Sequence, residues 1–125
     1  MRKTVLIADD NAFVRTALYE LFEREPDFQV CAMAENGREA IEEACRLHPD
    51  LIVLDLTMPL MKGLDAARDL KDVIPEVPLI MHCATPEECS EALAESQGFF
   101  EIVSKSDKVS VLIDKAKSLV DRKPA

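Results

Sequence analysis

The sequence predicts an α/β fold: a three-layer sandwich in which five helices cover a five-stranded parallel sheet of order 2-1-3-4-5. Short apolar runs alternate along the chain with segments of helical period. These runs are apolar on both faces, which is typical of central strands in a parallel sheet covered by helices. Right-handed crossovers leave few topologies for such an alternation, and the doubly wound order is favoured for five strands.

The predicted strands are runs rich in Val, Ile or Leu at residues 5–8, 30–34, 51–54, 79–81 and 102–103. The first predicted helix carries apolar residues at helical spacing from Val14 to Phe22, and Pro26 stops it. The second begins after Asn36, a favourable N-cap residue, with Glu39 placed to close a capping box.

The third predicted helix follows Gly63 and has a weaker apolar stripe. The fourth has a strong start signal in residues 85–88, Thr-Pro-Glu-Glu, which supply a capping hydroxyl, a proline at the first helical position and a glutamate for a capping box. We expect this helix to end at Gly98. The last helix has the clearest apolar stripe, from Val109 to Val120.

Length and composition limit the classes of protein. The 125 residues fit one domain, predicted at residues 1–120, with residues 121–125 as a tail or the start of a linker.

The formal charge of −9 disfavours direct binding to nucleic acid or to an anionic membrane surface. The three glycines are too far apart for a Gly-rich phosphate loop. Without an export signal, a cytoplasmic location and reduced cysteines are expected, so disulfide scaffolds are set aside. Zinc sites are set aside because the four cysteines form no C-x-x-C pair and the two histidines lie in no Cys/His cluster.

Polar residues follow four of the predicted strands. Asp9 and Asp10 follow the first strand, Asp55 the third, Cys83 the fourth and Lys105 the fifth. Because the carboxyl ends of parallel strands share one edge of the sheet, we expect these side chains to converge. Three carboxylates cannot all stay ionised beside one amine unless a cation joins them or their pKa values rise. Mg²⁺ is the ordinary solution, and Asp55 is the best placed nucleophile toward a phosphoryl group.

With this edge defined, the chain resembles a bacterial two-component response-regulator receiver domain over nearly its whole length, which implies a flavodoxin-like fold. The matching segments are residues 5–11 (Val-Leu-Ile-Ala-Asp-Asp-Asn), Asn36-Gly37, residues 49–55 ending in Asp55, Met58-Pro59, Gly63 and Lys105. Residues 13–15 and 105–107 are similar to receivers of the subfamily with a C-terminal helix-turn-helix output domain.

The resemblance implies that Asp55 accepts a phosphoryl group from a histidine kinase, a phosphotransfer protein or a small phosphodonor. Asp10 and Asp55 would bind Mg²⁺ or Mn²⁺ directly, Asp9 would bind it through water, and the backbone carbonyl of Thr57 would be a further ligand. Lys105 would contact the phosphoryl group. Such a signalling domain catalyses only its own phosphorylation and dephosphorylation and is not an enzyme in the usual sense; a homodimer is one assembly open to it.

Several positions depart from the family pattern. Cys83 stands where the family has a hydroxyl residue that moves toward the phosphate, and a thiol is a weak donor. Ile102 stands at the aromatic switch position, with Phe100 two residues earlier. Ser106 replaces the usual proline, so we expect a trans Lys105–Ser106 bond. The hypothesis is that phosphorylation chemistry is retained while the conformational switch is muted.

Other functions remain open. A Mg²⁺-dependent phosphohydrolase would need a second acid two residues after Asp55, where Thr57 stands. A phosphorylation-independent interaction module is favoured by the altered switch positions but opposed by the complete set of acids. A flavin carrier would need a Ser/Thr/Gly-rich loop after the first strand, where Asp9 and Asp10 lie instead. Redox sensing at Cys83 is disfavoured, because its acidic neighbours would raise the pKa of the thiol.

Overall fold

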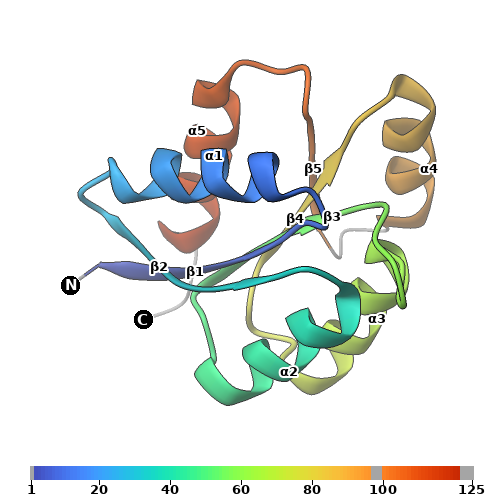
Figure 1. The fold of residues 1–125 in the computed structure, drawn as a ribbon, viewed down its shortest axis with the longest axis horizontal. Coiled ribbons are helices and arrows are strands. Elements are labelled where there is room, and N and C mark those ends of the chain that lie inside the picture. Colours follow the sequence, from blue (N-terminus) through green and yellow to red (C-terminus); the bar gives the residue numbers. More distant parts are fainter. Residues whose placement is uncertain (1, 97–99, 122–125) are drawn as a thin grey trace.

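In the computed structural model, strands and helices alternate along the chain as the apolar pattern predicts (Figure 1). The structure describes residues 2–96 and 100–121. The strands are β1 (Lys3–Ala8), β2 (Phe28–Ala34), β3 (Leu51–Asp55), β4 (Leu79–Cys83) and β5 (Glu101–Ser104). The helices are α1 (Ala12–Glu23), α2 (Gly37–Leu47), α3 (Gly63–Val73), α4 (Pro86–Ser96) and α5 (Val109–Asp121).

All neighbouring strands are parallel, and their order across the sheet is β2-β1-β3-β4-β5, which confirms the predicted topology. The chain therefore winds in one direction from β1 to β2 and in the other from β3 to β5. This reversal lies between β1 and β3, which pair from Val5↔Leu51 to Ala8↔Leu54. Open α/β sheets bind their ligands outside the carboxyl ends of the strands at such a reversal.

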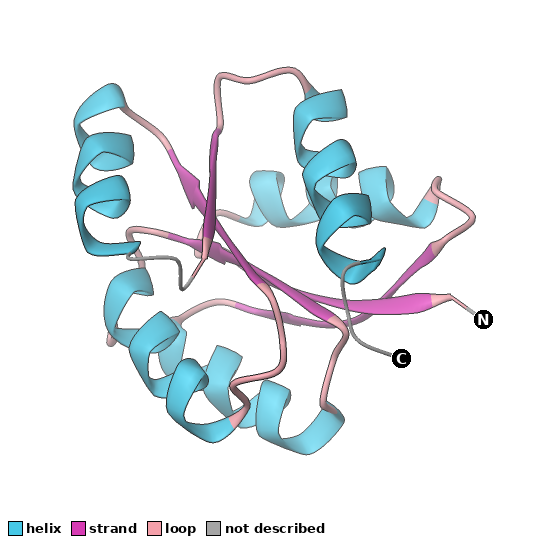
Figure 2. Ribbon diagram, turned by 180° about the vertical axis from the view of Figure 1, so that it is seen from behind, coloured by secondary structure: helices cyan, strands magenta, loops and turns pink. Residues whose placement is uncertain are grey.

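The sheet is the middle of three layers, with α1 and α5 on one face and α2, α3 and α4 on the other (Figures 1 and 2). Each face has its own apolar core because successive side chains of a strand point to opposite sides. Leu18 and Phe22 of α1 pack with Leu112 of α5 in the first core. Ala40 of α2 and Leu70 of α3 lie in the second.

The strand ends differ from the predicted ones in a way that matters for the site. β3 and β4 each run beyond their apolar residues, so that Asp55 and Cys83 are the last residues of their strands. The backbone ladder continues there, pairing Asp55 with His82 and Cys83 with Ser104. Hydrogen bonding between strands does not depend on side-chain polarity, which is why an apolar pattern ends too early.

The predicted helix caps are present, with one difference in detail. Asn36 Oδ1 accepts a hydrogen bond from the Glu39 N–H at 2.9 Å, and Thr85 Oγ1 accepts one from the Glu88 N–H at 3.1 Å. In both capping boxes the glutamate reaches the residue before the cap, and Glu39 Oε1 accepts from the Glu35 N–H at 2.9 Å. The predicted end of the fourth helix, Gly98, lies outside the described residues.

Candidate functional site

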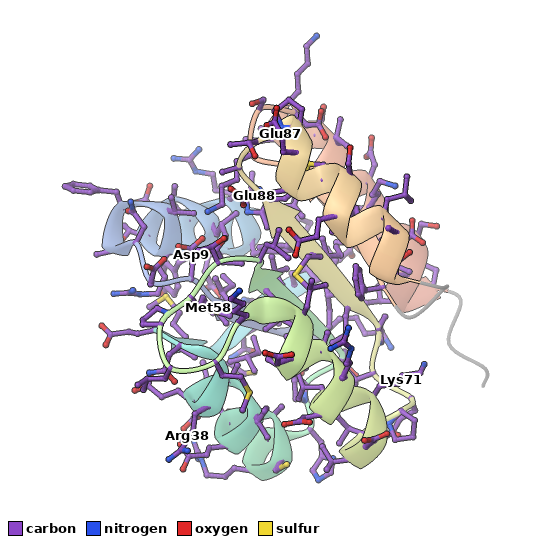
Figure 3. All side chains as sticks on the ribbon, turned by 90° about the vertical axis from the view of Figure 1, so that its right-hand side faces the viewer. Asp9, Arg38, Met58, Lys71, Glu87 and Glu88 are labelled. Atoms are coloured by element: carbon purple, nitrogen blue, oxygen red, sulfur yellow. A yellow bond between two sulfur atoms is a disulfide. The ribbon has the colours of Figure 1, made fainter. Side chains whose placement is uncertain are left out.

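Three aspartates meet at the carboxyl edge of the sheet, where the two halves of the fold diverge. Asp9 and Asp10 follow β1, and Asp55 ends the adjacent strand β3. Each offers a carboxylate oxygen, and these oxygens all lie within 4.8 Å of one another. Figure 3 labels Asp9 at this edge, together with Glu88 from the first turn of α4.

Lys105, directly after β5, brings its amine into the same cluster. Its Nζ lies 3.0 Å from Asp55 Oδ1 and 3.2 Å from Asp9 Oδ2. The turn behind it is closed locally, since Ser104 N–H donates to Asp107 Oδ2 at 3.1 Å and Asp107 N–H donates to the Ser104 carbonyl at 3.0 Å. The Lys105–Ser106 peptide bond is trans, as predicted.

The acids differ in their access to water. Asp9 is 1% and Asp55 4% exposed, whereas Asp10 is exposed. Asp9 is held in place because its Oδ1 accepts the Asn11 N–H at 2.9 Å and its carbonyl accepts from Arg15 Nη1 at 2.8 Å. Asp9 Oδ2 is buried and, apart from its ion pair with Lys105, has no hydrogen-bond partner among the described residues.

Burial and charge act against each other at Asp55. Desolvation raises the pKa of the Asp55 carboxyl to about 6, and the neighbouring charge of Asp9 adds to the rise while Lys105 opposes it. For Lys105, desolvation alone would lower the pKa, but its bonds and charges with Asp55 and Asp9 outweigh that effect and raise it. The single positive charge of Lys105 therefore does not balance the three carboxylates, and a further cation would stabilise their ionised forms.

The residues of the cluster suit a hard divalent cation. Asp9, Asp10 and Asp55 offer only oxygen ligands, as Mg²⁺ and Mn²⁺ prefer. The buried Oδ2 of Asp9 has no partner among the described residues other than the Lys105 amine, and Asp10 is exposed to water, of which Mg²⁺ retains several molecules. The donor set and its geometry fit a magnesium site.

Cys83 does not carry the free thiol expected at this edge. Its sulfur is bonded to Cys89 in a disulfide, with the two Cα atoms 5.6 Å apart. Disulfides were set aside because the cysteines form no C-x-x-C pair and, without an export signal, reduced thiols were expected; for Cys83 and Cys89 that expectation is wrong. The two lie six positions apart in the sequence, yet the helix that starts after Thr85 turns back over the end of β4 and brings them together. Cys31 and Cys45 are free.

Ile102 lies on β5, whereas Phe100 lies just before that strand. Ile102 is partly buried against the core that faces α2, α3 and α4, and Phe100, 8% exposed, lies in the same core. The Cys83 side chain belongs to this core as well. Two of the three positions that depart from the family pattern, Cys83 and Ile102, therefore share one side of the sheet.

Glu88 and His82 are close to the site, although the sequence indicated no such role for either. Glu88 Oε1 accepts from Thr57 Oγ1 at 3.5 Å and from the Ala84 N–H at 3.4 Å, so the first turn of α4 contacts the loop after Asp55. The capping-box pattern could have indicated the second contact.

His82 is buried beside Asp55, its Nδ1 has no partner among the described residues, and burial lowers its pKa to about 4.

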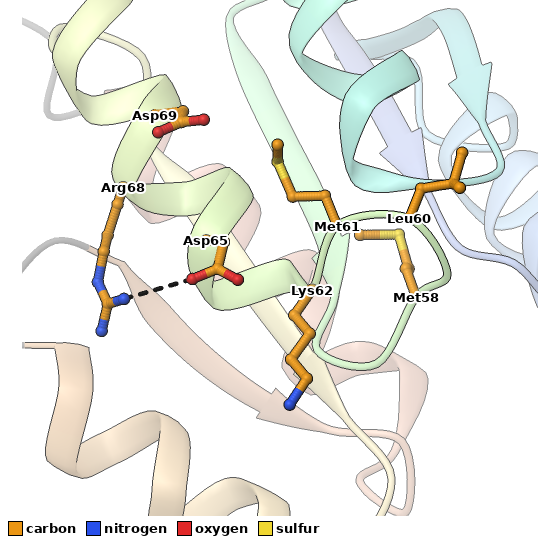
Figure 4. Close-up of a pocket in the computed structure, with 7 residues that line it drawn as sticks. All are labelled: Met58, Leu60, Met61, Lys62, Asp65, Arg68 and Asp69. Carbon is orange, nitrogen blue, oxygen red and sulfur yellow. Dashed lines mark hydrogen bonds and ion pairs between the residues drawn. The ribbon is translucent and has the colours of Figure 1, made fainter.

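A separate hollow of about 790 Å³ lies over the loop before α3 (Figure 4). Its walls include Met58, Leu60 and Lys62, and Arg68 pairs there with Asp65 at 3.4 Å. None of the three clustered aspartates lines it. The charged cluster, and not this hollow, is the chemically distinctive part of the molecule.

The fold and the cluster define a class: doubly wound α/β domains with an acidic, metal-binding type of site at the carboxyl edge of the sheet. Within that class the chain belongs to the response regulator receiver domain family, whose model matches residues 5–117. The response regulator domain of Thermotoga maritima CheB superposes with a TM-score of 0.89 and 27% identity, over 99% of this chain and 100% of that one. The REC domain of AraT from Geobacillus stearothermophilus gives 0.82 and 29%, over 98% and 95%.

Curated relatives are longer than this chain. A protein-glutamate methylesterase/protein-glutamine glutaminase from Methanosarcina acetivorans is 39% identical over 119 residues, which cover 94% of this chain and 34% of that protein. The predicted likeness to receivers with helix-turn-helix output extends to the fold alone: a LuxR-family regulator from Aurantimonas has a TM-score of 0.89 but 23% identity, over 100% of this chain and 89% of that one. Among the described residues, no helix has the length and apolarity needed to cross a membrane.

Proposed function

We propose that this chain is the phosphoacceptor of a two-component signalling system, and that Asp55 receives the phosphoryl group. The observation that carries the proposal is the joint position of three carboxylates and the Lys105 amine, which lies 3.0 Å from Asp55 and 3.2 Å from Asp9. No single one of these residues implies phosphoryl transfer. Their convergence at one edge of a receiver fold is what such a transfer requires.

The proposed acceptor is Asp55 because of its place and its neighbours. A carboxylate oxygen of Asp55 attacks the phosphorus atom of a phosphohistidine or a small phosphodonor, and the bond from phosphorus to the donor breaks. The donor leaves and takes up a proton from solvent. Lys105, already at hydrogen-bond distance from Asp55, is placed to hold an oxygen of the transferred group.

The proposed metal ligands are Asp10 and Asp55 directly, Asp9 through a water molecule, and the backbone carbonyl of Thr57. Bound Mg²⁺ or Mn²⁺ would offset the negative charge that the phosphoryl group brings. The protein's own contribution is to hold the ligands ready: Asn11 and Arg15 fix Asp9, and β3 fixes Asp55. Glu88, which accepts from the Thr57 hydroxyl, would help position the loop that carries the Thr57 carbonyl.

The proposed donor is a histidine kinase or a phosphotransfer protein. Membership of the receiver family supports such a partner in general. We propose that residues 1–120 form the receiver and that residues 121–125 are a tail or the start of a linker. The chain spans about a third of the length of the Methanosarcina relative, so the proposal does not extend to that protein's activity. Catalysis by the chain itself would be limited to gain and loss of its own phosphoryl group.

Cys83 and Ile102 are the proposed switch positions. In the disulfide the sulfur of Cys83 has no hydrogen to donate, and Ile102 has no polar atom in its side chain. These two residues support the hypothesis that the conformational response is muted in the oxidised chain. Neither residue takes part in the proposed phosphoryl transfer, which depends on the three aspartates and Lys105.

Labelling by a small phosphodonor tests the proposal. The chain is incubated with acetyl phosphate and Mg²⁺, and intact mass spectrometry is expected to show the gain of one phosphoryl group, localised to Asp55. The Asp55→Asn variant should gain nothing, and chelation of Mg²⁺ should abolish labelling of the wild type. A wild type that gains no mass, or an Asp55→Asn variant that gains as much, contradicts the proposal and leaves the interaction module as the better function.

A further inference from the structure

The Cys83–Cys89 disulfide closes a short ring between the sheet and α4. The ring contains residues 83–89 and includes the whole β4–α4 connection, Ala84 and Thr85. Cys83 is the last residue of β4, and Cys89 lies one turn into α4. The bond therefore ties the start of a helix to a strand that ends at the acidic cluster.

This ring is coupled to the cluster by two further contacts. The carbonyl of Cys83 accepts the Lys105 N–H at 2.7 Å, and Lys105 Nζ contacts Asp55 and Asp9. On the other side, Glu88 within the ring accepts from the Thr57 hydroxyl. A change in the position of the first turn of α4 would therefore act on two neighbours of Asp55: Lys105, through Cys83, and Thr57, through Glu88.

The two cysteines differ in their exposure to solvent. Cys83 is 0% exposed, whereas Cys89 is partly exposed on α4. We therefore expect a thiolate from solution to attack the disulfide at Cys89, because Cys83 is enclosed in the core.

We propose that Cys83–Cys89 is a redox modification site, reduced and reformed by dithiol–disulfide exchange, which sets the freedom of the first turns of α4. We propose in addition that it controls how far α4 responds to phosphorylation, a part that rests on the proposed function. In the oxidised form α4 is tied to β4, and the switch position holds a sulfur without hydrogen. In the reduced form α4 is untied, and Cys83 regains a thiol that can donate.

The reductant is a dithiol, either a small molecule or a thioredoxin-like protein. One of its thiolates attacks Cys89 Sγ, the S–S bond breaks, and Cys83 leaves as a thiolate that takes up a proton. The second thiol of the reductant then attacks the mixed disulfide and releases Cys89. Two protein thiols and one oxidised dithiol result, and a small disulfide runs the sequence in reverse.

Thiol counting tests whether the site exists. When alkylated in denaturant, the oxidised chain should react at two cysteines, Cys31 and Cys45. A chain that was reduced by dithiothreitol while folded, and then alkylated in denaturant, should react at all four. A titration against mixtures of reduced and oxidised dithiothreitol should give one reversible transition, lost in Cys89→Ser and kept in the control Cys45→Ser. Four reactive thiols under mildly oxidising conditions, or a bond that no dithiol reduces in the folded chain, overturns the proposal.

Hydrogen exchange tests the effect on α4. Reduction should speed exchange of amides in residues 87–92 by roughly tenfold, because the constraint on this segment is removed. Amides of α2, which contains Cys45, should exchange at the same rate in both forms. Cys89→Ser should resemble the reduced wild type whether or not oxidant is present. Equal exchange of residues 87–92 in oxidised and reduced wild type contradicts the proposed effect.

The part that rests on phosphorylation has its own readout. With Mg²⁺ and beryllofluoride as a phosphoryl mimic, the change in α4 exchange should be several-fold larger in the reduced than in the oxidised chain. Equal changes in the two forms overturn this part alone. If neither form takes up a phosphoryl group or the mimic while reduction still frees α4, the proposed function fails and the redox site stands.

Discussion

At the scale of single residues, Asp55 is an acid whose ionisation works against the metal-free fold. It is 4% exposed, and desolvation raises its pKa from 3.8 to about 6. The folded state therefore holds a proton more tightly than the unfolded chain does. Protonated Asp55 therefore contributes to the stability of the fold. This contribution is fully present below pH 3.8 and is lost as the pH rises through about 6.

The Asp55→Asn variant should accordingly be more stable than the wild type in the absence of divalent metal. At pH 7.5 the gain in the free energy of unfolding should be about 1–3 kcal/mol, and it should shrink as the pH falls from 6 toward 4. Urea unfolding at several pH values, with a chelator present, measures this. The exposed acid Asp69 supplies the control, Asp69→Asn. A destabilised Asp55→Asn chain at pH 7.5 would contradict the account of the site.

Lys105 should affect metal binding and phosphorylation in opposite directions. Its amine competes with a cation for Asp55 and Asp9, so Lys105→Ala should bind Mg²⁺ about tenfold more tightly. The same variant should be labelled by acetyl phosphate at least ~100-fold more slowly, since a donor to the phosphoryl group is lost. Calorimetric titration and labelling rates measure the two effects. Lys115→Ala, which removes an ion pair with Glu101, is the control and should change neither.

At the scale of elements, the loop from β3 to α3 must pass very close to the strand end that carries Asp55. Gly63, the first residue of α3, donates its N–H to the Leu56 carbonyl at 2.9 Å. A Cβ atom at Gly63 would overlap the Asp55 carbonyl oxygen and lie 2.9 Å from Leu56 Cα. These neighbours are backbone atoms, which cannot move aside as a flexible side chain can.

The Gly63→Ala variant should therefore lose about 2 kcal/mol of stability and phosphorylate more slowly, because the loop must shift at Asp55. Thermal unfolding and acetyl phosphate labelling measure the two effects. The control Glu42→Ala places an alanine on the exposed side of α2, where no backbone clash arises, and should change stability little. Equal stability of Gly63→Ala and wild type would show that the loop adapts freely.

Secondary-structure elements were predictable to the extent that their signals are local. The Thr85 cap and the Asn36 cap act within four residues, and both are present. The Cys83–Cys89 bond was not predictable, because it depends on where α4 packs over β4. Packing against the sheet decides the direction of a helix after a capped turn. The six-position spacing of the two cysteines does not indicate that direction.

At the scale of the whole molecule, the site belongs to no single element, since its acids and its amine come from the ends of β1, β3 and β5. Binding of a cation there should stabilise the complete fold. At a Mg²⁺ concentration ten times Kd, the free energy of unfolding should rise by about 1.4 kcal/mol. Thermal unfolding should shift upward by ~5 °C.

Thermal scans with MgCl₂ and with NaCl of equal ionic strength measure this effect. Only the magnesium series should shift the transition, and Asp10→Asn should remove most of the shift while folding normally, because Asp10 is exposed. A shift of the same size with NaCl would assign the effect to screening of the net charge of −9 instead of to a bound ion.

The sequence by itself determined the topology and the membership of the site. Alternating apolar runs and helical segments left one favoured strand order, and that order brings Asp9, Asp10, Asp55 and Lys105 to one edge. Only the tertiary structure decided the finer chemistry: the burial that raises the pKa of Asp55, the contact of Glu88 with Thr57, and the bond between Cys83 and Cys89. Parallel strands impose a common edge whatever the side chains are, whereas burial and sulfur pairing depend on ångström-scale packing between elements.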